Sequence, residues 1–271
     1  MSMRRVVDPA GEVRWLADRD GIGAVTGYDQ QGWHASTWVL HAMYHNSGLD
    51  GLGSHHDHYR RRLASGEASP AIIGQVNLDE VSTVTGMPLG FTVRPGAPWR
   101  RLLWRDHLGW GDGPCPPDQA FPPSYRWFPH RSWPLSFEPP AEGSLDEASL
   151  EALVAVLAEH SSRGRDTRCV VFYCALAAGD FDTPHVWEGP LAAVGDLIEN
   201  RGGTYPSSPT NFWPRDRSWF VWTDWDLSAT KVSGTGTLIE AIKSSNRLET
   251  IDWPLTRRDQ DPAAGSASRP P

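Results

Sequence analysis

The chain has 271 residues, a formal net charge of −8 and a 39% hydrophobic content that includes 14 Trp. That apolar content is enough to bury a sizeable core, and the length fits one large domain or two modest ones. The acidic balance argues against nonspecific nucleic-acid binding, which depends on neutralising phosphates. No apolar run approaches the roughly 18 residues that span a bilayer, so we expect neither a nucleic-acid nor a membrane protein.

The first zone, residues 12–106, is expected to be an α/β subdomain. Ser36 or Thr37 is placed to cap a short helix over "HASTWVLHAMYHN". Ser54 is placed to begin a second helix, with Asp57 completing an approximate capping box. Strand-like stretches follow at 71–77, 81–86, 89–95 and 99–104.

The second zone, residues 107–143, is too rich in proline to form a central strand or a long helix. A flexible linker would be poor in aromatic residues, but this segment contains Trp110, Phe121, Tyr125, Trp127, Phe128, Trp133 and Phe137. We therefore expect an ordered arm that lies on the folded body with buried rings. The alternative is a flexible tether between two independent domains.

The third zone, residues 144–255, is expected to be a second α/β subdomain, followed by a disordered tail at 256–271. A capping box of Ser144 and Glu147 predicts a helix. Further elements are expected in "RCVVFYCAL" (strand), "GPLAAVGDLIEN" (helix), "DRSWFVWTDWDL" (strand), "ATKVSG" (strand), "TLIEAIKSS" (helix) and "LETIDW" (strand). This mixture predicts an α/β (α+β) fold, with helices packed on a mixed, largely antiparallel sheet and two subdomains joined by the arm.

Six of the ten histidines lie between residues 34 and 58. On the expected helix, His41 and His45 are four residues apart and share a face, as two zinc ligands do. His55, Asp57 or His58 is placed to supply a third ligand, and "HHD" also resembles the His-x-Asp element of non-haem iron sites. The alternative is that Asp57 caps its helix, that most of these histidines are solvated, and that His41 is a hydrogen-bonded core residue.

Asp224 and Asp226 alternate with Trp225 at the expected end of a strand, so their carboxylates face the same side. Such a pair can hold a divalent ion or the metal of a sugar nucleotide. The alternative is that the two aspartates pair with a nearby Arg or Lys, or cap a turn.

His185 and Glu188 are expected in a turn-rich segment after a buried strand. A histidine and a carboxylate in such a place can act as acid and base. They would make the protein a metal-free enzyme acting on sugars, amines or aryl metabolites.

Aromatic and arginine residues dominate binding hot spots. We therefore predict a recognition surface made of Trp127, Trp133, Trp213, Arg215, Arg217 and Trp222. The leading hypothesis is a cytosolic binding protein whose partner is another protein, as in an immunity-type pair, or a small apolar ligand. The alternative is a small metal-dependent hydrolase or oxygenase that binds Zn or Fe through the 34–58 cluster.

The three cysteines, Cys115, Cys169 and Cys174, have no paired metal spacing, which favours reduced thiols in a cytoplasm. The stretches "WVLHAMY" and "FWPRDRSWFVWTDWDLSATKVSG" resemble segments of uncharacterised actinobacterial proteins. That resemblance implies no activity and no functional residue.

Overall fold

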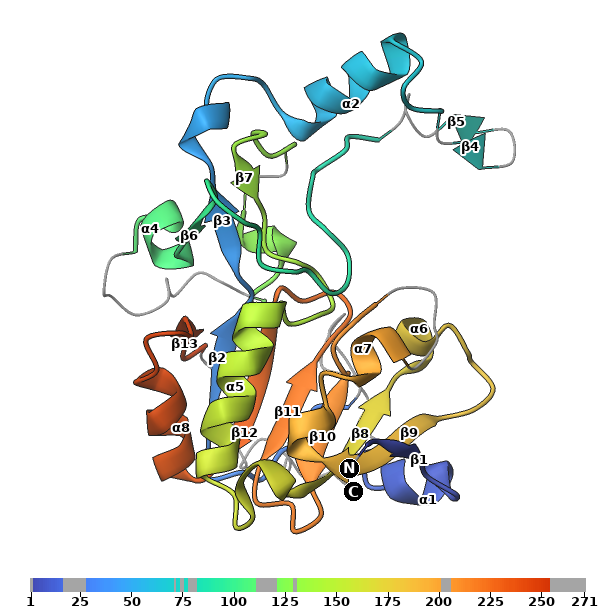
Figure 1. Ribbon diagram of the computed structural model, residues 1–271, viewed down its shortest axis with the longest axis vertical. Coiled ribbons are helices and arrows are strands. Elements are labelled where there is room, and N and C mark those ends of the chain that lie inside the picture. The colour runs from blue at the N-terminus through green and yellow to red at the C-terminus, as the bar shows by residue number, and fades with distance from the viewer. Residues whose placement is uncertain are drawn as a thin grey trace, which may run out of the picture.

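The centre of the molecule is an eight-stranded antiparallel sheet with the order β1-β9-β8-β10-β11-β12-β2-β13 (Figure 1). The structure is a computed structural model that describes residues 2–16, 28–70, 72–73, 76–77, 82–110, 121–128, 131–200 and 206–253. The strands of this sheet are β1 (Arg4–Arg5), β2 (Ala35–Leu40), β8 (Arg168–Tyr173), β9 (His185–Pro190), β10 (Asn211–Pro214), β11 (Phe220–Thr223), β12 (Ala229–Gly234) and β13 (Thr250–Ile251). The predicted α+β class is confirmed.

Strand β2 lies between β12 and β13, both from the C-terminal half of the chain. The segment that contains β2 was expected to form a helix, and that prediction is wrong. The reason is burial on both faces. The side chains of Thr37 and Val39 are buried on one face of the sheet, and those of Trp38 and Leu40 are buried on the other. Because β2 is covered on both faces, Trp38, Val39 and Leu40 are consecutive apolar residues and lack the polar alternation that identifies a half-buried strand.

Helices cover one face of the sheet, where α5 (Glu147–Glu159) and α8 (Gly236–Lys243) lie side by side (Figure 1). The apolar face predicted for α5 is buried, with Leu150, Leu153, Val154 and Leu157 in one core cluster. The cap differs from the prediction: Asp146, not Ser144, accepts the Ser149 N–H at 2.9 Å.

The side chain of Ser144 instead donates to the Leu145 carbonyl and accepts the Ser208 N–H, which joins two loops. The expected helix over 189–200 is divided into η4 (Leu191–Ala193) and α7 (Leu197–Asn200), because β9 runs on to Pro190. Three further short helices are α1 (Pro9–Val13), α6 (Ala175–Ala178) and η3 (Gly164–Asp166).

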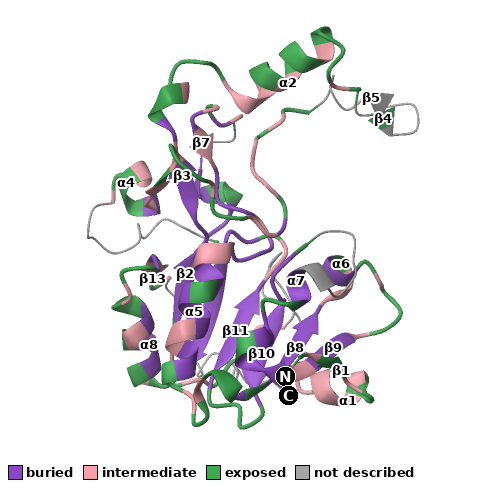
Figure 2. Cartoon of the chain, viewed as in Figure 1, coloured by how far each residue is buried: buried purple, intermediate pink, exposed green. Residues whose placement is uncertain are grey.

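Aromatic side chains cover the other face of the sheet. Trp38, Phe172, Trp213, Phe220 and Trp222 project from the strands and are buried. Figure 2 shows that the central strands of the large sheet are mostly buried. The same cluster continues into α4 (Trp104–Leu108) and the arm, through Trp104, Trp127, Phe128 and Trp133. The described parts of the arm, 107–110, 121–128 and 131–143, are therefore packed against the body.

A second, three-stranded sheet sits above the large one and consists of β3 (Met43–His45), β6 (Arg100–Leu102) and β7 (Phe137–Glu138) (Figure 1). The other elements are η1 (Ser47–Leu49), η2 (Tyr125–Trp127), α2 (His55–Ala64) and the ladder of β4 (Ile72–Ile73) with β5 (Val76–Asn77). The prediction of strands at 81–86 and 89–95 is wrong for the described residues 82–95. These residues form isolated backbone hydrogen bonds to loops, such as the one from the Phe91 N–H to the Pro206 carbonyl. The tail at 256–271 lies outside the described residues.

Candidate functional site

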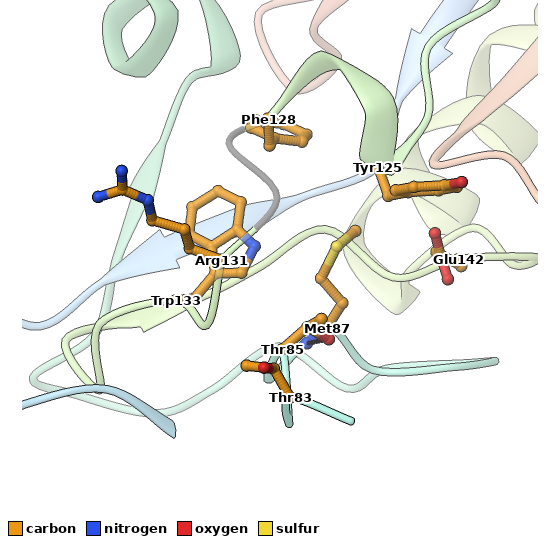
Figure 3. A pocket seen from close by; sticks show the side chains of 8 residues that line it. All are labelled: Thr83, Thr85, Met87, Tyr125, Phe128, Arg131, Trp133 and Glu142. Atoms are coloured by element: carbon orange, nitrogen blue, oxygen red, sulfur yellow. Dashed lines mark hydrogen bonds between the residues drawn. The ribbon is translucent and has the colours of Figure 1, made fainter. Parts of the chain in front are cut away.

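A cavity of about 340 Å³ lies against the arm (Figure 3). Five of its lining residues belong to the arm and three to the segment 83–87. The lining residues are Thr83, Thr85, Met87, Tyr125, Phe128, Arg131, Trp133 and Glu142. We call this cavity the arm pocket.

Backbone hydrogen bonds fix the Trp133 wall of the arm pocket. The Trp133 N–H donates to the Thr85 carbonyl at 2.8 Å, and the Trp133 carbonyl accepts the His55 N–H at 2.9 Å. His55 is the first residue of α2, and its Nε2 lies 2.9 Å from the Phe137 carbonyl. The start of α2 therefore holds both the arm and the 83–87 segment in place.

The aromatic walls of the arm pocket extend an inner stack of rings. Phe128 and Trp133 have exposed fractions of 3% and 6%, and their centroids are 5.0 Å apart with planes at 58°. Behind them, Trp104 is 4.6 Å from Phe128 and His107 is 5.1 Å from Trp133. This support leaves the two rings little freedom to collapse into the cavity, while Tyr125 is exposed at its edge.

The other end of the arm pocket is acidic. The Glu142 N–H donates to the Pro88 carbonyl at 3.0 Å, and its carbonyl accepts the Gly90 N–H at 2.9 Å. Burial raises the pKa of Glu142, and the charge of Asp226 raises it further. Asp226 in turn donates its N–H to Asp224 Oδ1 at 3.0 Å.

Burial raises the pKa of Asp224 to about 6, with a further rise from the charge of Asp226 and an opposing effect of the Asp226 N–H. The two aspartates follow β11 as predicted and form a turn. A β-carbon at Gly143, whose φ is +73°, would lie 2.9 Å from the Trp225 carbonyl oxygen. Only glycine permits the close approach that brings the Asp224–Asp226 turn beside Glu142.

The predicted metal ligands do not share a helical face, because His41 follows β2 and His45 ends β3. His41 is completely buried, with Nδ1 2.7 Å from the Ala141 carbonyl and Nε2 3.0 Å from Thr230 Oγ1. Burial lowers the pKa of His41 to about 4. His45 Nε2 lies 2.9 Å from Asp50 Oδ1.

Asp57 has the capping role that was considered as the alternative to metal binding. It accepts hydrogen bonds from the Ser54 N–H at 2.9 Å and the Ser54 hydroxyl at 2.8 Å, and these bonds lower the pKa of Asp57. His58 is exposed on α2. Within the described ranges, no group of three His, Cys, Asp or Glu side chains is arranged to hold a metal ion.

His185 and Glu188 lie on β9 and not in a turn-rich segment. Side chains alternate along a strand, so these two residues face opposite sides of the sheet. His185 Nε2 is 2.7 Å from Asp180 Oδ2. Arg215, Arg4 and Arg168 surround the Glu188 carboxylate, and the hydrogen bond from Arg215 contributes most to lowering the pKa of Glu188 to about 2.

Four of the six predicted recognition residues, Trp127, Trp133, Trp213 and Trp222, are buried in one aromatic cluster and do not form an exposed surface. Trp213 and Trp222 are buried in the sheet, and Trp127 is buried with its Nε1–H donating to the Phe121 carbonyl. Arg215 pairs with Glu12 and Glu188, and Arg217 stacks 4.3 Å from the ring centre of Trp15. Trp133 is the one of the six that lines the arm pocket. The sequence analysis missed Arg131, which lies within the aromatic run of the arm, and Glu142, which follows it.

Comparison of the chain with protein-family models, with curated proteins and with solved structures gave no match. Among the helices that the structure describes, none has the length and apolar character needed to cross a bilayer.

Proposed function

We propose that this protein binds a small organic ligand in the arm pocket. The observation that carries the proposal is that two buried rings, Phe128 and Trp133, line a cavity of about 340 Å³ instead of closing it. Ligand pockets typically measure some 300–1,000 Å³ and combine apolar walls with a few polar groups. Here Thr83, Thr85 and Glu142 supply the polar groups.

The arrangement favours a pocket that exists before the ligand arrives. The backbone of Trp133 is held by its N–H, which donates to the Thr85 carbonyl, and by its carbonyl, which accepts the His55 N–H. Trp104 supports the ring of Phe128. A preformed site avoids much of the ordering cost of binding. A role in binding therefore needs no rearrangement of the arm.

Cytosolic location is part of this proposal, since Cys169 and Cys174 are free thiols, as in a reducing compartment. A protein partner of the immunity type stays a prediction, because no surface of the described residues favours it over a small ligand. The metal-dependent hydrolase or oxygenase also stays a prediction, with no ligand group among the described residues to support it.

Labelling with 5-fluorotryptophan tests the proposal, because fluorine NMR gives one resonance per tryptophan. Trp133→Phe assigns the Trp133 resonance, and Trp213→Phe assigns a control resonance in the sheet core. We expect members of a library of neutral and charged aryl and alkyl fragments to shift the Trp133 resonance saturably and leave that of Trp213 unchanged. If no fragment moves Trp133, or if those that bind move only other resonances, the proposal is wrong.

A further inference from the structure

We infer that the ligand of the arm pocket is an organic cation, of the methylated ammonium class, held between the aromatic rings and Glu142. This inference rests on the proposed function and specifies the ligand further.

The carboxylate of Glu142 carries the first step of the argument. It is half-buried in the pocket wall, yet no described side chain donates a hydrogen bond to it or forms an ion pair with it. Removing an ionised carboxylate from water without a partner costs free energy. A cationic ligand would supply the missing partner.

The charges around the pocket give it a negative end. Asp226 lies close enough to raise the pKa of Glu142, and Asp224 belongs to the same turn. Among the described residues of the lining, the one cation is Arg131, which is exposed and whose guanidinium points away from Glu142 (Figure 3). An anionic ligand would be repelled at the Glu142 end, where a cation is attracted.

The aromatic walls select among cations. The faces of Trp, Tyr and Phe attract a cation within about 6 Å of the ring centre, and the gain is larger when the cation is desolvated. Phe128 and Trp133 present adjoining rings at 58°, with Tyr125 beside them and the polarisable thioether of Met87 opposite. A methylated ammonium holds its water weakly and has the apolar surface these walls bury, whereas a metal ion needs several oxygen, nitrogen or sulfur ligands.

The test uses two probes of nearly equal shape: choline, which is charged, and 3,3-dimethylbutan-1-ol, its neutral isostere. Both are titrated against the Trp133 resonance of the fluorinated protein. We expect choline to bind wild type at least tenfold more tightly than the alcohol. In Glu142→Gln that preference should fall severalfold, with the affinity for the alcohol unchanged, because the substitution keeps the shape and the aromatic walls but removes the charge of Glu142.

Two further variants separate charge from structural damage. Glu138→Gln removes another half-buried carboxylate of the arm, on β7 and outside the pocket lining, so the preference for choline should remain. Arg131→Gln removes a repelling charge and should strengthen choline binding, a gain that damage to the pocket would not produce.

The outcomes distinguish this inference from the proposed function. If neutral fragments move Trp133 but choline binds no better than the alcohol, the cation inference is wrong and the proposed function stands. If Glu142→Gln keeps the full preference for choline, the inference is also wrong. If neither the fragments nor either probe moves Trp133, both proposals fail.

Discussion

The imidazole of His41 illustrates how burial changes what a titratable residue can do. It has partners on both ring nitrogens, from Ala141 and Thr230, and no contact with water. The four-residue spacing between His41 and His45 suits a metal site only on a helix. In the structure this segment instead forms the strands β2 and β3. The alternative of a hydrogen-bonded core histidine describes the side chain well, but its partners come from residues 100 and 189 positions away and could not be predicted from local sequence.

His41 should make stability depend on pH. Burial lowers its pKa from 6.5 to about 4 in the folded state, so between these values the unfolded chain binds the additional proton. The contribution of His41 to the free energy of unfolding is complete above pH 6.5. It decreases as pH falls toward 4, by about 3 kcal/mol in total. Urea unfolding measures the free energy of unfolding. For His41→Gln we expect this free energy to be lower than that of wild type at pH 7 and to change less with pH between 6.5 and 4. An unchanged slope in the variant would contradict this.

Glu188 should act in the opposite sense, as a carboxylate stabilised by arginines. Its folded pKa of about 2 lies below the ordinary value of 4.5, so its contribution is complete above pH 4.5 and decreases as pH falls toward 2. Its partners Arg4, Arg168 and Arg215 are partly exposed, so solvent screens the interaction. We expect Glu188→Gln to cost about 1 kcal/mol of unfolding free energy at pH 7.

High salt provides the check on the Glu188 prediction. The destabilisation by Glu188→Gln should shrink in about 1 M NaCl, where the screening length is about 3 Å. Glu240→Gln, at the exposed pair with Lys243, serves as the matched control and should change stability little in either condition. A loss for Glu188→Gln that is independent of salt would indicate lost packing instead of lost charge pairing.

At the level of elements, local signals correctly predicted the helix α2 and the buried strands β8, β11 and β12, whereas β2 was expected to be a helix. Ser54 and Asp57 form the predicted capping box of α2, because this motif acts over three residues. Strand β2 was missed because its identity depends on β12 and β13, which follow nearly two hundred residues later. The cap of α5 was predicted at Ser144 but is Asp146. The Ser144 hydroxyl instead accepts a hydrogen bond from the Ser208 N–H, in a loop far away in sequence.

The cap of α2 connects helix stability to the arm pocket. Ser54→Ala removes one acceptor at the helix start and should cost about 1 kcal/mol locally. Because the His55 N–H donates to the Trp133 carbonyl, we expect amide exchange to accelerate at residues 55–58 and at Trp133. Ser65→Ala, at the other end of α2, is the control and should leave Trp133 unaffected. Equal exchange at Trp133 in both variants would show that the helix does not support the pocket.

At the scale of the whole molecule, the abundance of aromatic residues in the arm predicted buried rings, and Trp127, Phe128 and Trp133 of the arm are buried. What it contacts was not predictable, since each ring packs on residues far away in sequence. Trp104 is fully buried. Its indole Nε1–H donates to the His41 carbonyl, and its backbone N–H donates to the Glu249 carboxylate. Its ring packs on Trp127 and Phe128 of the arm. The indole of Trp104 therefore contacts both the arm and the residue after β2, while the backbone of Trp104 bonds to Glu249 next to β13.

This shared packing should make the arm and the large sheet unfold together. Trp104→Ala removes a fully buried ring, so we expect it to cost about 3–5 kcal/mol of unfolding free energy. In the fluorinated protein, the resonances of Trp133 in the arm and Trp213 in the sheet should lose their native signals at the same urea concentration, in wild type and variant alike. Trp104→Ala should lower both midpoints equally. A midpoint for Trp133 well below that of Trp213 would instead mean that the arm is a separate unit, because loss of its contacts would then leave the sheet folded.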